Sequence, residues 1–353
     1  TAHLIGATLS AAGRCVRVMG TLTGSRTTPE STDLQRSLAE HRRHGVDTVV
    51  MEVSSHALAL HRVDGIVFDV AVFTNLGRDH LDLHGSMEAY FDAKASLFGP
   101  SAARRGVTNL DDEHGRRLAR SASIPMVGFS SADIAVVSIA ADEVRFRWQG
   151  QDVCIALGGA FNVTNALAAL TAVRSLGFDA GAAAAGIATA GAVPGRFEFV
   201  GEPGAGPAVI VDYAHTPDGL DQVLRAVRPL ATGRVVVVFG CGGDRDREKR
   251  PEMGLVAARL ADAVVVTSDN PRSEPPLAII DDIVDGIPVD ARDRLEVVVD
   301  RRAAIESAII GGSVGDVVVV AGKGHETTQV IAGVEHEFDD RLVALEALGR
   351  RTG

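Results

Sequence analysis

Residues 47–56 have the sequence Asp47-Thr48-Val49-Val50-Met51-Glu52-Val53-Ser54-Ser55-His56. The apolar, β-branched run 48–51 predicts a buried parallel strand that ends in polar residues. A second apolar run, 66–73, predicts another strand, which is followed by Thr74-Asn75-Leu76-Gly77-Arg78-Asp79-His80. Because ligands in open α/β sheets bind beyond the carboxyl ends of the strands, we expect Glu52 and His80 to face one site.

A carboxylate and an imidazole at neighbouring strand ends are suited to a divalent metal ion that carries phosphate oxygens. The alternative is structural, with Glu52 in a salt bridge and His80 capping a helix. A helix predicted over 86–97 carries Lys94. A lone lysine on a helix is usually a solvated charge, so Lys94 by itself indicates no site.

Length and charge limit the class of protein. The 353-residue chain is longer than one hydrophobic core usually spans, which predicts two domains. Its formal net charge of −11 argues against a nucleic-acid partner and leaves small charged or phosphorylated substrates. The three cysteines show no metal spacing and no disulfide framework, as is typical of a reducing cytoplasm. With neither a membrane-length apolar run nor a secretory signal, we expect a cytoplasmic protein.

The first half of the chain is expected to alternate strands and helices. A helix begins at Thr1, a strand covers 15–19, and a Gly/Thr-rich loop over 20–30 precedes a helix over 31–44. This loop is suited to an anionic ligand at the helix N-terminus, or else forms an ordinary capped turn. Further β-like runs are expected at 106–109, 126–129, 134–139, 144–148 and 152–157, followed by Ala-rich helices over 165–190. Asn162 and Asn165 are expected to cap these helices, with a contact to a base or ribose as the alternative.

A turn-rich stretch at 191–198 is a candidate hinge, and the alternation then starts again. Strands predicted at 208–211, 234–239, 263–267, 295–299 and 317–321 indicate a second, doubly wound domain. Polar stretches follow four of these strands, at 212–217, 240–246, 268–272 and 322–326. Since these stretches would face the same crevice, we expect a ligand-binding edge there.

The side chains at that edge suggest an amino acid as the ligand. Arg245 and Arg272 can each hold a carboxylate with two hydrogen bonds, whereas Asp269, Asn270 and Glu326 can accept from ammonium groups. The alternative for a single Arg is an exposed ion pair of little energetic consequence.

The ordered motifs of the chain resemble those of the Mur ligase family over essentially its whole length. They are Thr27-Thr28-Pro29, Met51-Glu52-Val53-Ser54-Ser55-His56, Asn75-Leu76-Gly77-Arg78-Asp79-His80-Leu81-Asp82-Leu83-His84-Gly85, Lys94, Phe161-Asn162-Val163-Thr164-Asn165, Pro194-Gly195-Arg196-Phe197-Glu198, Asp212-Tyr213-Ala214-His215-Thr216-Pro217, Gly240-Cys241-Gly242-Gly243-Asp244-Arg245-Asp246-Arg247, Asp269-Asn270-Pro271-Arg272 and Gly322-Lys323-Gly324-His325-Glu326.

The resemblance implies a fold and an activity. It implies an α/β protein with a central ATP-binding, catalytic domain of mostly parallel sheet over 1–195 and a Rossmann-like, doubly wound, amino-acid-binding domain over 196–353. It implies an ATP-dependent amide ligase of peptidoglycan precursor synthesis that joins meso-diaminopimelate to UDP-MurNAc-L-Ala-D-Glu through an acyl phosphate, with ATP and Mg²⁺. The family uses the form Asp269-Asn270-Pro271-Arg272 for meso-diaminopimelate, and Arg272 would hold the carboxylate that lysine lacks.

The resemblance also implies roles for individual residues. Those matching the magnesium site are Glu52, His80 and Lys94, the last as a carbamylated lysine that is also catalytic. Those matching the site for the muramoyl dipeptide are Thr27, Thr28, Ser54 and Arg62. Those matching the ATP site are Asn165, Arg196 and Asp212. Those matching the diaminopimelate site are Arg245, Asp269, Asn270, Arg272, Gly322 and Glu326. Lys323 and His325 match a motif near the active site and are candidate catalytic residues.

One departure from the family changes what we expect of this chain. The family's phosphate-binding loop, Gly-x-x-Gly-Lys-Thr-Thr, is not in the sequence, and Thr1 matches the residue just after it. We therefore expect a fragment that also lacks the N-terminal UDP-binding domain and is inactive alone. The alternatives are a ligase like folylpolyglutamate synthetase, or a non-catalytic remnant that binds a nucleotide or amino acid.

Overall fold

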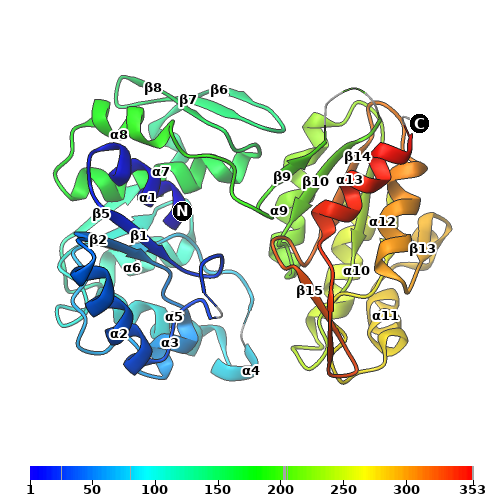
Figure 1. Cartoon of the computed structure of the whole chain (residues 1–353), viewed down its shortest axis with the longest axis horizontal. Helices are drawn as coiled ribbons and strands as arrows, with labels where there is room; N and C mark the ends of the chain where they lie inside the picture. The colour runs from blue at the N-terminus through cyan, green and yellow to red at the C-terminus, as the bar shows by residue number, and fades with distance from the viewer. Residues whose placement is uncertain (25, 80, 202–203, 205, 352–353) are drawn as a thin grey trace. The chain divides into compact units, whose positions relative to one another are not determined.

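The computed structural model describes the chain except residues 25, 80, 202–203, 205 and 352–353, and the described residues form two compact units. The N-terminal unit comprises residues 1–139 and 143–191, and the C-terminal unit comprises 140–142 and 192–353. Figure 1 shows the elements of each unit.

Two small parallel sheets and one antiparallel sheet build the N-terminal unit. In the first, β1 (Val16–Met19) pairs with β2 (Thr48–Met51), and in the second, β4 (Gly106–Asn109) lies between β3 (Ala71–Phe73) and β5 (Met126–Phe129). The antiparallel sheet is a meander of β6 (Ala135–Ile139), β7 (Val144–Trp148) and β8 (Gln151–Ile155). Apolar and polar residues alternate along β7, so its Val144, Phe146 and Trp148 are buried.

The helices of this unit follow from its apolar periodicity and from side-chain caps. Ser86 caps α5 by accepting from the N–H of Ala89, and Asp112 caps α6 by accepting from that of Gly115. Phe73, Phe91 and Phe98 pack in a core beneath α5. The helices are α1 (Ala2–Ala11), α2 (Ser31–Arg43), α3 (Ser55–Ala59), α4 (Leu81–His84), α5 (Met87–Ala95), α6 (Glu113–Ser121), α7 (Ala160–Ser175) and α8 (Ala180–Ile187).

The second predicted strand is shorter than the sequence suggests. Only the last three residues of 66–73 form β3, because Phe68 makes an isolated bridge to Ala103 and the chain pairs with β4 only from Ala71 onward. Among the described residues β2 and β3 do not pair, and they lie in different sheets. A cavity of about 490 Å³ is lined by both strands and by residues of α1 and α7.

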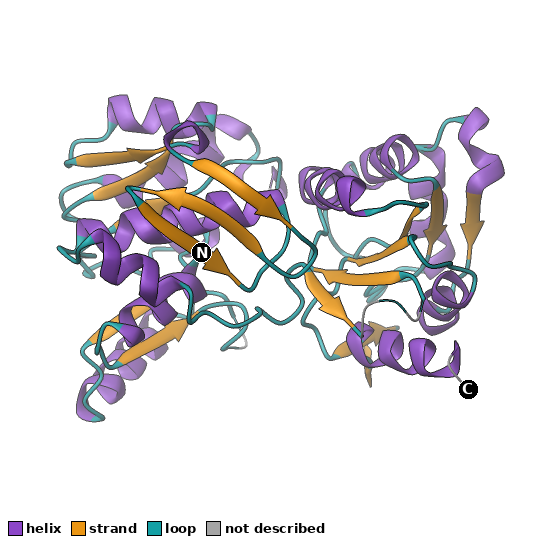
Figure 2. Cartoon of the chain, turned by 90° about the horizontal axis from the view of Figure 1, so that it is seen from above, coloured by secondary structure: helices purple, strands orange, loops and turns teal. Residues whose placement is uncertain are grey.

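The C-terminal unit contains a six-stranded sheet in the order β13-β12-β11-β14-β10-β9, parallel except for the edge strand β9. Helices lie on both faces of the sheet (Figure 2), which confirms the predicted doubly wound fold. Because both faces are covered, β11 and β14 are buried along their whole length and consist almost entirely of valine. The strands are β9 (Glu198–Val200), β10 (Ala208–Asp212), β11 (Val235–Phe239), β12 (Ala263–Val266), β13 (Leu295–Val297) and β14 (Val317–Ala321).

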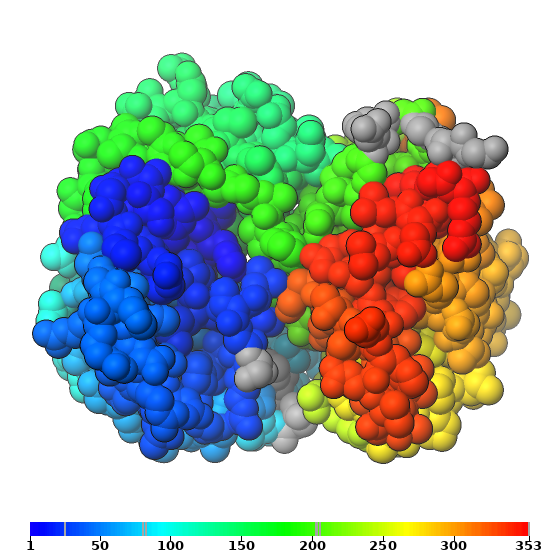
Figure 3. Space-filling model, in the orientation of Figure 1, coloured from blue at the N-terminus to red at the C-terminus, as the bar shows by residue number. Residues whose placement is uncertain are grey.

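The covering helices form two groups. Helices α9 (Pro217–Val227), α10 (Lys249–Leu260) and α11 (Pro276–Asp285) pack in sequence, and α12 (Arg301–Ile310) packs against α13 (Asp340–Arg351). A hairpin of β15 (Thr328–Ile331) and β16 (Val334–Glu337), which the sequence did not predict, follows β14. Strand β16 is exposed along its length on the surface drawn in Figure 3. No helix among the described residues is long and apolar enough to cross a membrane.

A buried ion pair joins the ends of two strands of this sheet. Arg301 and Asp340 are both fully buried, and Arg301 Nη2 lies 2.7 Å from Asp340 Oδ2. Arg301 also donates to the carbonyl oxygens of Ser268 and Ala321, which follow β12 and end β14. This guanidinium therefore fixes the carboxyl ends of both strands, where the polar stretches begin.

Candidate functional site

Glu52 lies at the centre of a hydrogen-bond network after β2. Its Oε2 accepts from the backbone N–H of Thr21 at 3.0 Å and from Thr21 Oγ1 at 2.8 Å. A Cβ on Gly20 would lie 2.8 Å from the same oxygen, so a larger residue there would displace the Glu52 carboxylate from these hydrogen bonds. The Gly/Thr-rich loop thus holds Glu52, and no side chain caps α2, contrary to the capped-turn alternative.

The four residues predicted to hold the muramoyl dipeptide extend this network. Thr28 Oγ1 donates to the carbonyl oxygen of Glu52 at 2.9 Å and accepts from the N–H of Ser54 at 3.0 Å. Arg62 donates to the carbonyl oxygen of Thr28 at 3.2 Å. Thr27 Oγ1 lies 3.0 Å from Thr21 Oγ1. The structure therefore brings these residues together around the carboxyl end of β2.

Lys94 lines the same cavity as Glu52 and Asn75. Its Nζ lies 5.0 Å from the ring centre of Tyr90. Burial lowers the pKa of Lys94, although Asp79 and Asp112 act in the opposite direction. Lys94 is thus not the solvated charge that a lone helical lysine suggests, and His80, the third predicted metal ligand, lies outside the described residues.

Asn162 and Asn165 do not cap α7, contrary to the default prediction. The helix begins at Ala160 with Gly159 at the N-cap, so both lie inside its first turns. Asn162 donates to the carbonyl oxygen of Gly158 at 2.7 Å, and Asn165 donates to Asn162 at 3.0 Å. Asn165 Oδ1 accepts from Thr1 Oγ1 at 2.7 Å, which places it beside the start of α1.

The other two predicted ATP contacts, Arg196 and Asp212, lie in the C-terminal unit. The Arg196 guanidinium lies over the Tyr213 ring, 4.4 Å from its centre. Asp212 is buried at the end of β10 and accepts from the N–H of Phe197 at 2.7 Å. Burial raises the pKa of Asp212 to about 6, against the opposing charge of Arg196. The ring of His325 packs on the same Tyr213, 5.0 Å between centres.

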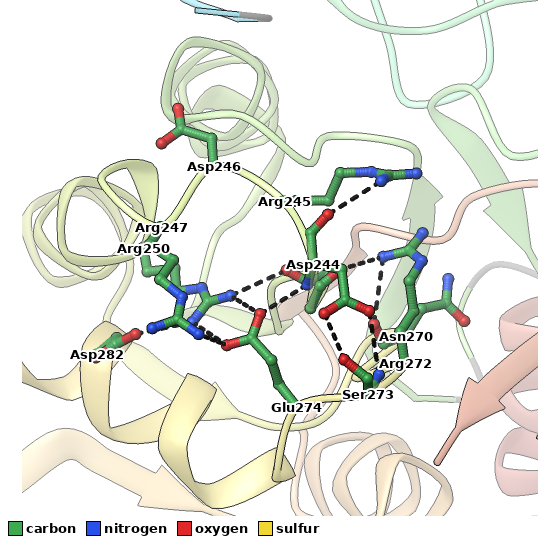
Figure 4. Close-up of polar contacts among 12 residues, drawn as sticks. Asp244, Arg245, Asp246, Arg247, Arg250, Asn270, Arg272, Ser273, Glu274 and Asp282 are labelled. Carbon is green, nitrogen blue, oxygen red and sulfur yellow. Dashed lines mark hydrogen bonds and ion pairs between the residues drawn. The ribbon is translucent and has the colours of Figure 1, made fainter. Parts of the chain in front are cut away.

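Arg272 is held in an unusual backbone conformation beside the loop after β11. Its φ is +55°, and its side chain donates to the carbonyl oxygen of Gly243 at 2.8 Å. Arg245 is exposed and donates to the carbonyl oxygen of Asp244 at 3.1 Å. In Figure 4 the two guanidiniums lie on the same side of Asp244. Each of these guanidiniums could bind a carboxylate with two hydrogen bonds.

Asn270 and Glu326 connect the ends of β12 and β14. Asn270 Nδ2 donates to Glu326 Oε2 at 2.7 Å. Asp269 is buried, and a Cβ on Gly322 would lie 2.6 Å from Asp269 Oδ2, so glycine is required at that close contact. All six residues predicted for diaminopimelate therefore lie on the three strand-end loops that follow β11, β12 and β14.

The buried guanidinium of Arg250 stabilises these loops through ion pairs. Arg250 is fully buried and pairs with Glu274 at 2.8 Å and with Asp282 at 2.8 Å (Figure 4). The hydrogen bond from Arg250 holds the pKa of Glu274 at about 2. Glu274 also accepts from the N–H of Asp244, next to Arg245.

Sequence reasoning missed Thr21 and Arg250. Thr21 lies in a loop whose glycines and threonines indicated an anion site, and only its contact with Glu52 shows its role. Arg250 follows several charged residues, 244–249, and such a run is normally exposed, so the sequence contains no signal that this member is buried.

Comparison with known proteins identifies the family. Residues 1–173 match the Mur ligase middle domain, and residues 195–324 match the family described as Mur ligase, glutamate ligase domain. A UDP-N-acetylmuramoyl-L-alanyl-D-glutamate–2,6-diaminopimelate ligase from Streptomyces avermitilis is 48% identical over 352 residues, covering 93% of this chain and 68% of the relative.

Solved structures agree with this assignment. A structure of a UDP-N-acetylmuramoyl-L-alanyl-D-glutamate–2,6-diaminopimelate ligase superposes with a TM-score of 0.64 at 36% identity, covering 100% of this chain and 76% of that chain. A folylpolyglutamate synthase from Mycobacterium tuberculosis, solved with ADP, superposes with a TM-score of 0.67 at 20% identity, covering 91% of this chain and 84% of that chain. The second likeness shows a shared fold alone. The chain belongs to the Mur ligase family.

Proposed function

We propose that this chain takes part in the ATP-dependent ligation of meso-diaminopimelate to UDP-MurNAc-L-Ala-D-Glu, a step in the synthesis of peptidoglycan precursors. The observation that supports it most is the placement of Arg245, Arg272, Asn270 and Glu326 on the loops that follow β11, β12 and β14, together with the names of relatives that are nearly half identical. Residues 1–195 would form the catalytic, ATP-binding domain, and 196–353 the domain that binds the amino acid.

The chemistry consists of two transfers. The γ-phosphoryl group of ATP passes to the γ-carboxylate of the D-glutamate, which forms an acyl phosphate and ADP. The neutral amine of diaminopimelate then attacks the acyl carbon, loses its proton, and expels inorganic phosphate as the amide forms. The protein's task is mainly to position the reactants and to neutralise charge.

The network around Glu52 is suited to the muramoyl dipeptide. Thr27, Ser54 and Arg62 present hydroxyl and guanidinium groups beside the strand end, whereas the Thr28 hydroxyl donates its proton to the carbonyl oxygen of Glu52. The buried Nε of Arg62 has no hydrogen-bond partner in the described part of the chain. Arg62 Nη2 pairs with Glu30 at 2.9 Å, so a substrate anion would reach this guanidinium in competition with Glu30.

Two of the described residues, Glu52 and Lys94, could contribute to a site for a divalent cation. Both hydrogen bonds that reach the Glu52 carboxylate fall on Oε2, which leaves Oε1 for a metal. Lys94 lines the same cavity, and carbamylation would convert its amine into an oxygen ligand. Glu52, Lys94 and His80 would hold Mg²⁺, which when bound supplies positive charge to the transferring phosphoryl group.

Arg196, Asp212 and Asn165 are the proposed contacts of the nucleotide. The Arg196 guanidinium already packs on an aromatic ring, and Asp212 supplies a carboxylate acceptor. Lys323 and His325 belong to the loop after β14, and His325 packs on the same ring as Arg196. A catalytic part for these two residues stays a prediction.

In the C-terminal unit, Arg272 and Arg245 would hold the distal carboxylate of diaminopimelate. Arg272 gives one amino group to the carbonyl oxygens of Gly243 and Asn270, which leaves the rest of its planar guanidinium for the ligand. Glu326 would accept from a substrate ammonium. L-Lysine has no distal carboxylate, so this pair of arginines would distinguish the two amino acids.

The test is a ligation assay on the gene product as the cell makes it. With UDP-MurNAc-L-Ala-D-Glu, meso-diaminopimelate and ATP, we expect an amide product together with ADP and phosphate in equal amounts. L-Lysine should replace diaminopimelate poorly, and a pteroyl acceptor should not replace the muramoyl dipeptide. Turnover of the pteroyl acceptor in place of the dipeptide, or equal use of lysine, would contradict the proposal.

A further inference from the structure

Lys323 is an unusual residue in this chain. Lysine accounts for only three of the 35 basic residues, at positions 94, 249 and 323, so arginine carries nearly all the positive charge. Lys323 is fully buried, at 0% exposure, directly after the glycine that follows β14. A fully buried ammonium is rare unless each of its protons is matched by an acceptor.

All three ammonium protons of Lys323 have a partner within the described structure. Nζ donates to Glu326 Oε2 at 3.0 Å, to Asn270 Oδ1 at 3.2 Å and to the carbonyl oxygen of Thr328 at 2.5 Å. An ammonium has three donor protons and no acceptor, so these three hydrogen bonds use all of its protons. Lys323 therefore cannot contact a substrate without first losing one of them.

These bonds fix how Asn270 is oriented. Asn270 Oδ1 accepts from Lys323 and from the N–H of Val330, at 3.2 and 3.0 Å, so the oxygen of the amide must face both donors. The opposite group, Nδ2, then donates to Glu326 at 2.7 Å. One proton of Nδ2 and the second carboxylate oxygen of Glu326 remain for a ligand.

The hairpin is tied to the same loop. The N–H of Arg272 donates to the carbonyl oxygen of Val330 at 3.0 Å, and Gln329 donates to the carbonyl oxygen of Asp269 at 2.6 Å. Strand β15 thus runs beside residues 269–272, and Lys323 lies where the loop, the hairpin and Glu326 meet.

We propose that Lys323 is a positioning residue of the amino-acid pocket, which orients the Asn270 amide and the Glu326 carboxylate and anchors β15 against the Arg272 loop. This deepens the proposed function and rests on it. Lys323 acts through Asn270 and Glu326, and its own atoms do not touch the amino acid or the nucleotide, so this role replaces the catalytic one predicted for Lys323 from the sequence.

The test compares Lys323→Met, which removes the ammonium at similar volume, with Lys323→Gln, which keeps a neutral donor. The control is Arg234→Met, because Arg234 pairs with the buried Asp316 at 2.9 Å beside the other ends of β11 and β14. Isothermal titration with meso-diaminopimelate measures the affinity of each variant. Hydrogen exchange at the N–H of Val330 measures the anchoring of β15 without any ligand.

We expect Lys323→Met to raise the Kd for diaminopimelate by about 10- to 100-fold, the effect of losing hydrogen bonds to a charged group. Exchange at Val330 should speed up by at least about tenfold, and Lys323→Gln should lie between Lys323→Met and the wild type. Arg234→Met should lower stability with the Kd and the Val330 exchange unchanged. Adding Glu326→Gln to Lys323→Met should cost less than the sum of the two single effects.

An unchanged Kd in Lys323→Met, or unchanged Val330 exchange, would overturn the positioning role. Failure of the wild-type chain to bind diaminopimelate would instead overturn the proposed ligand of the pocket. Faster Val330 exchange in Lys323→Met would then still show that Lys323 anchors the hairpin. The titration and the exchange measurement together therefore distinguish failure of the positioning role from failure of the proposed function.

Discussion

Arg272 and Val330 are joined by a single backbone hydrogen bond of 3.0 Å, and this bond holds Arg272 in the left-handed region of backbone conformation, at φ +55°. A side chain in that region costs free energy, so the position would favour glycine on stability grounds alone. The chain nevertheless has arginine there. The backbone conformation of Arg272 and the role of its guanidinium can therefore be tested separately.

The first prediction separates stability from binding at this position. Arg272→Gly should leave the free energy of unfolding within about 1 kcal/mol of the wild type, because relief of the left-handed conformation offsets the lost bond to Gly243. The Kd for meso-diaminopimelate should rise by about 100-fold or more as the carboxylate loses its partner. Chemical denaturation and calorimetric titration measure the two quantities.

Ala332→Gly is the matched control, since Ala332 lies at the hairpin turn with φ +49° and carries no functional group. It should be as stable as the wild type or slightly more so, with unchanged affinity. Equal affinities for Arg272→Gly and Ala332→Gly would show that Arg272 does not bind the amino acid.

Arg250 provides a prediction about stability. Arg250→Met should destabilise the C-terminal unit by about 3 to 5 kcal/mol, because it leaves the Glu274 carboxylate, and Asp282 beside it, without their buried partner. Arg247 contacts the same Glu274 but is 69% exposed, so Arg247→Met should cost under about 1 kcal/mol. Urea denaturation measures the free energy of unfolding of both variants. An equal loss of stability in the two would contradict the structural role assigned to Arg250.

Asp212 predicts a pH dependence of stability. Its folded pKa of about 6 lies above the ordinary 3.8, so the folded state binds more protons than the unfolded state between these values. The Asp212 contribution therefore destabilises the fold progressively as pH rises from about 4 to about 6, by about 3 kcal/mol at most.

The measurement is the unfolding free energy of wild type minus that of Asp212→Asn, followed from pH 4 to pH 7. The asparagine side chain of the variant cannot ionise, so we expect this difference to decline with rising pH and to level off above pH 6. A difference that is constant, or that rises with pH, would show that burial does not raise the pKa of Asp212 in the folded state.

The lowered pKa of Lys94 leads us to predict a chemical modification of its amine. A lowered pKa increases the fraction of neutral amine, and only the neutral amine adds CO₂ to form a carbamate. With ¹³C-bicarbonate, the carbonyl region of the NMR spectrum should show a carbamate signal that Lys94→Arg abolishes, distinct from any signal of the α-amino group, whose ordinary pKa is about 8.

The small number of lysines makes this assignment direct. Lys249→Arg should keep the signal, because Lys249 is buried on α10 and is not among the residues that line the cavity of Lys94. A signal that survives Lys94→Arg, or that is lost in Lys249→Arg, would place the modification elsewhere.

The sequence predicted the fold well where valine-rich strands repeat. The runs at 48–51 and 317–321 are strands with those bounds, because continuous β-branched residues favour buried parallel strands. It failed at 66–73, where only Ala71–Phe73 is a strand, and at 328–337, where the short polar strands of the hairpin have no apolar pattern.

The positions of the candidate site residues follow the same pattern, while their roles stay predictions. Polar residues at strand ends are visible in sequence, and the loops after β11, β12 and β14 contain the residues expected there. Burial of Lys323 and Arg250 could not be predicted from the sequence. A basic residue in a polar stretch shows the same sequence pattern whether its side chain is solvated or buried. Only three-dimensional contacts distinguish a residue that binds a ligand from one that orients its neighbours.

The most direct test of the account is calorimetric titration of this 353-residue chain with meso-diaminopimelate. The controls are Arg272→Ala, Arg259→Ala at an exposed position on α10, and L-lysine as competitor. We predict saturable binding that is lost in Arg272→Ala, retained in Arg259→Ala and unaffected by lysine. Binding that survives Arg272→Ala, or that lysine displaces with similar affinity, would contradict the assignment of this pocket to diaminopimelate.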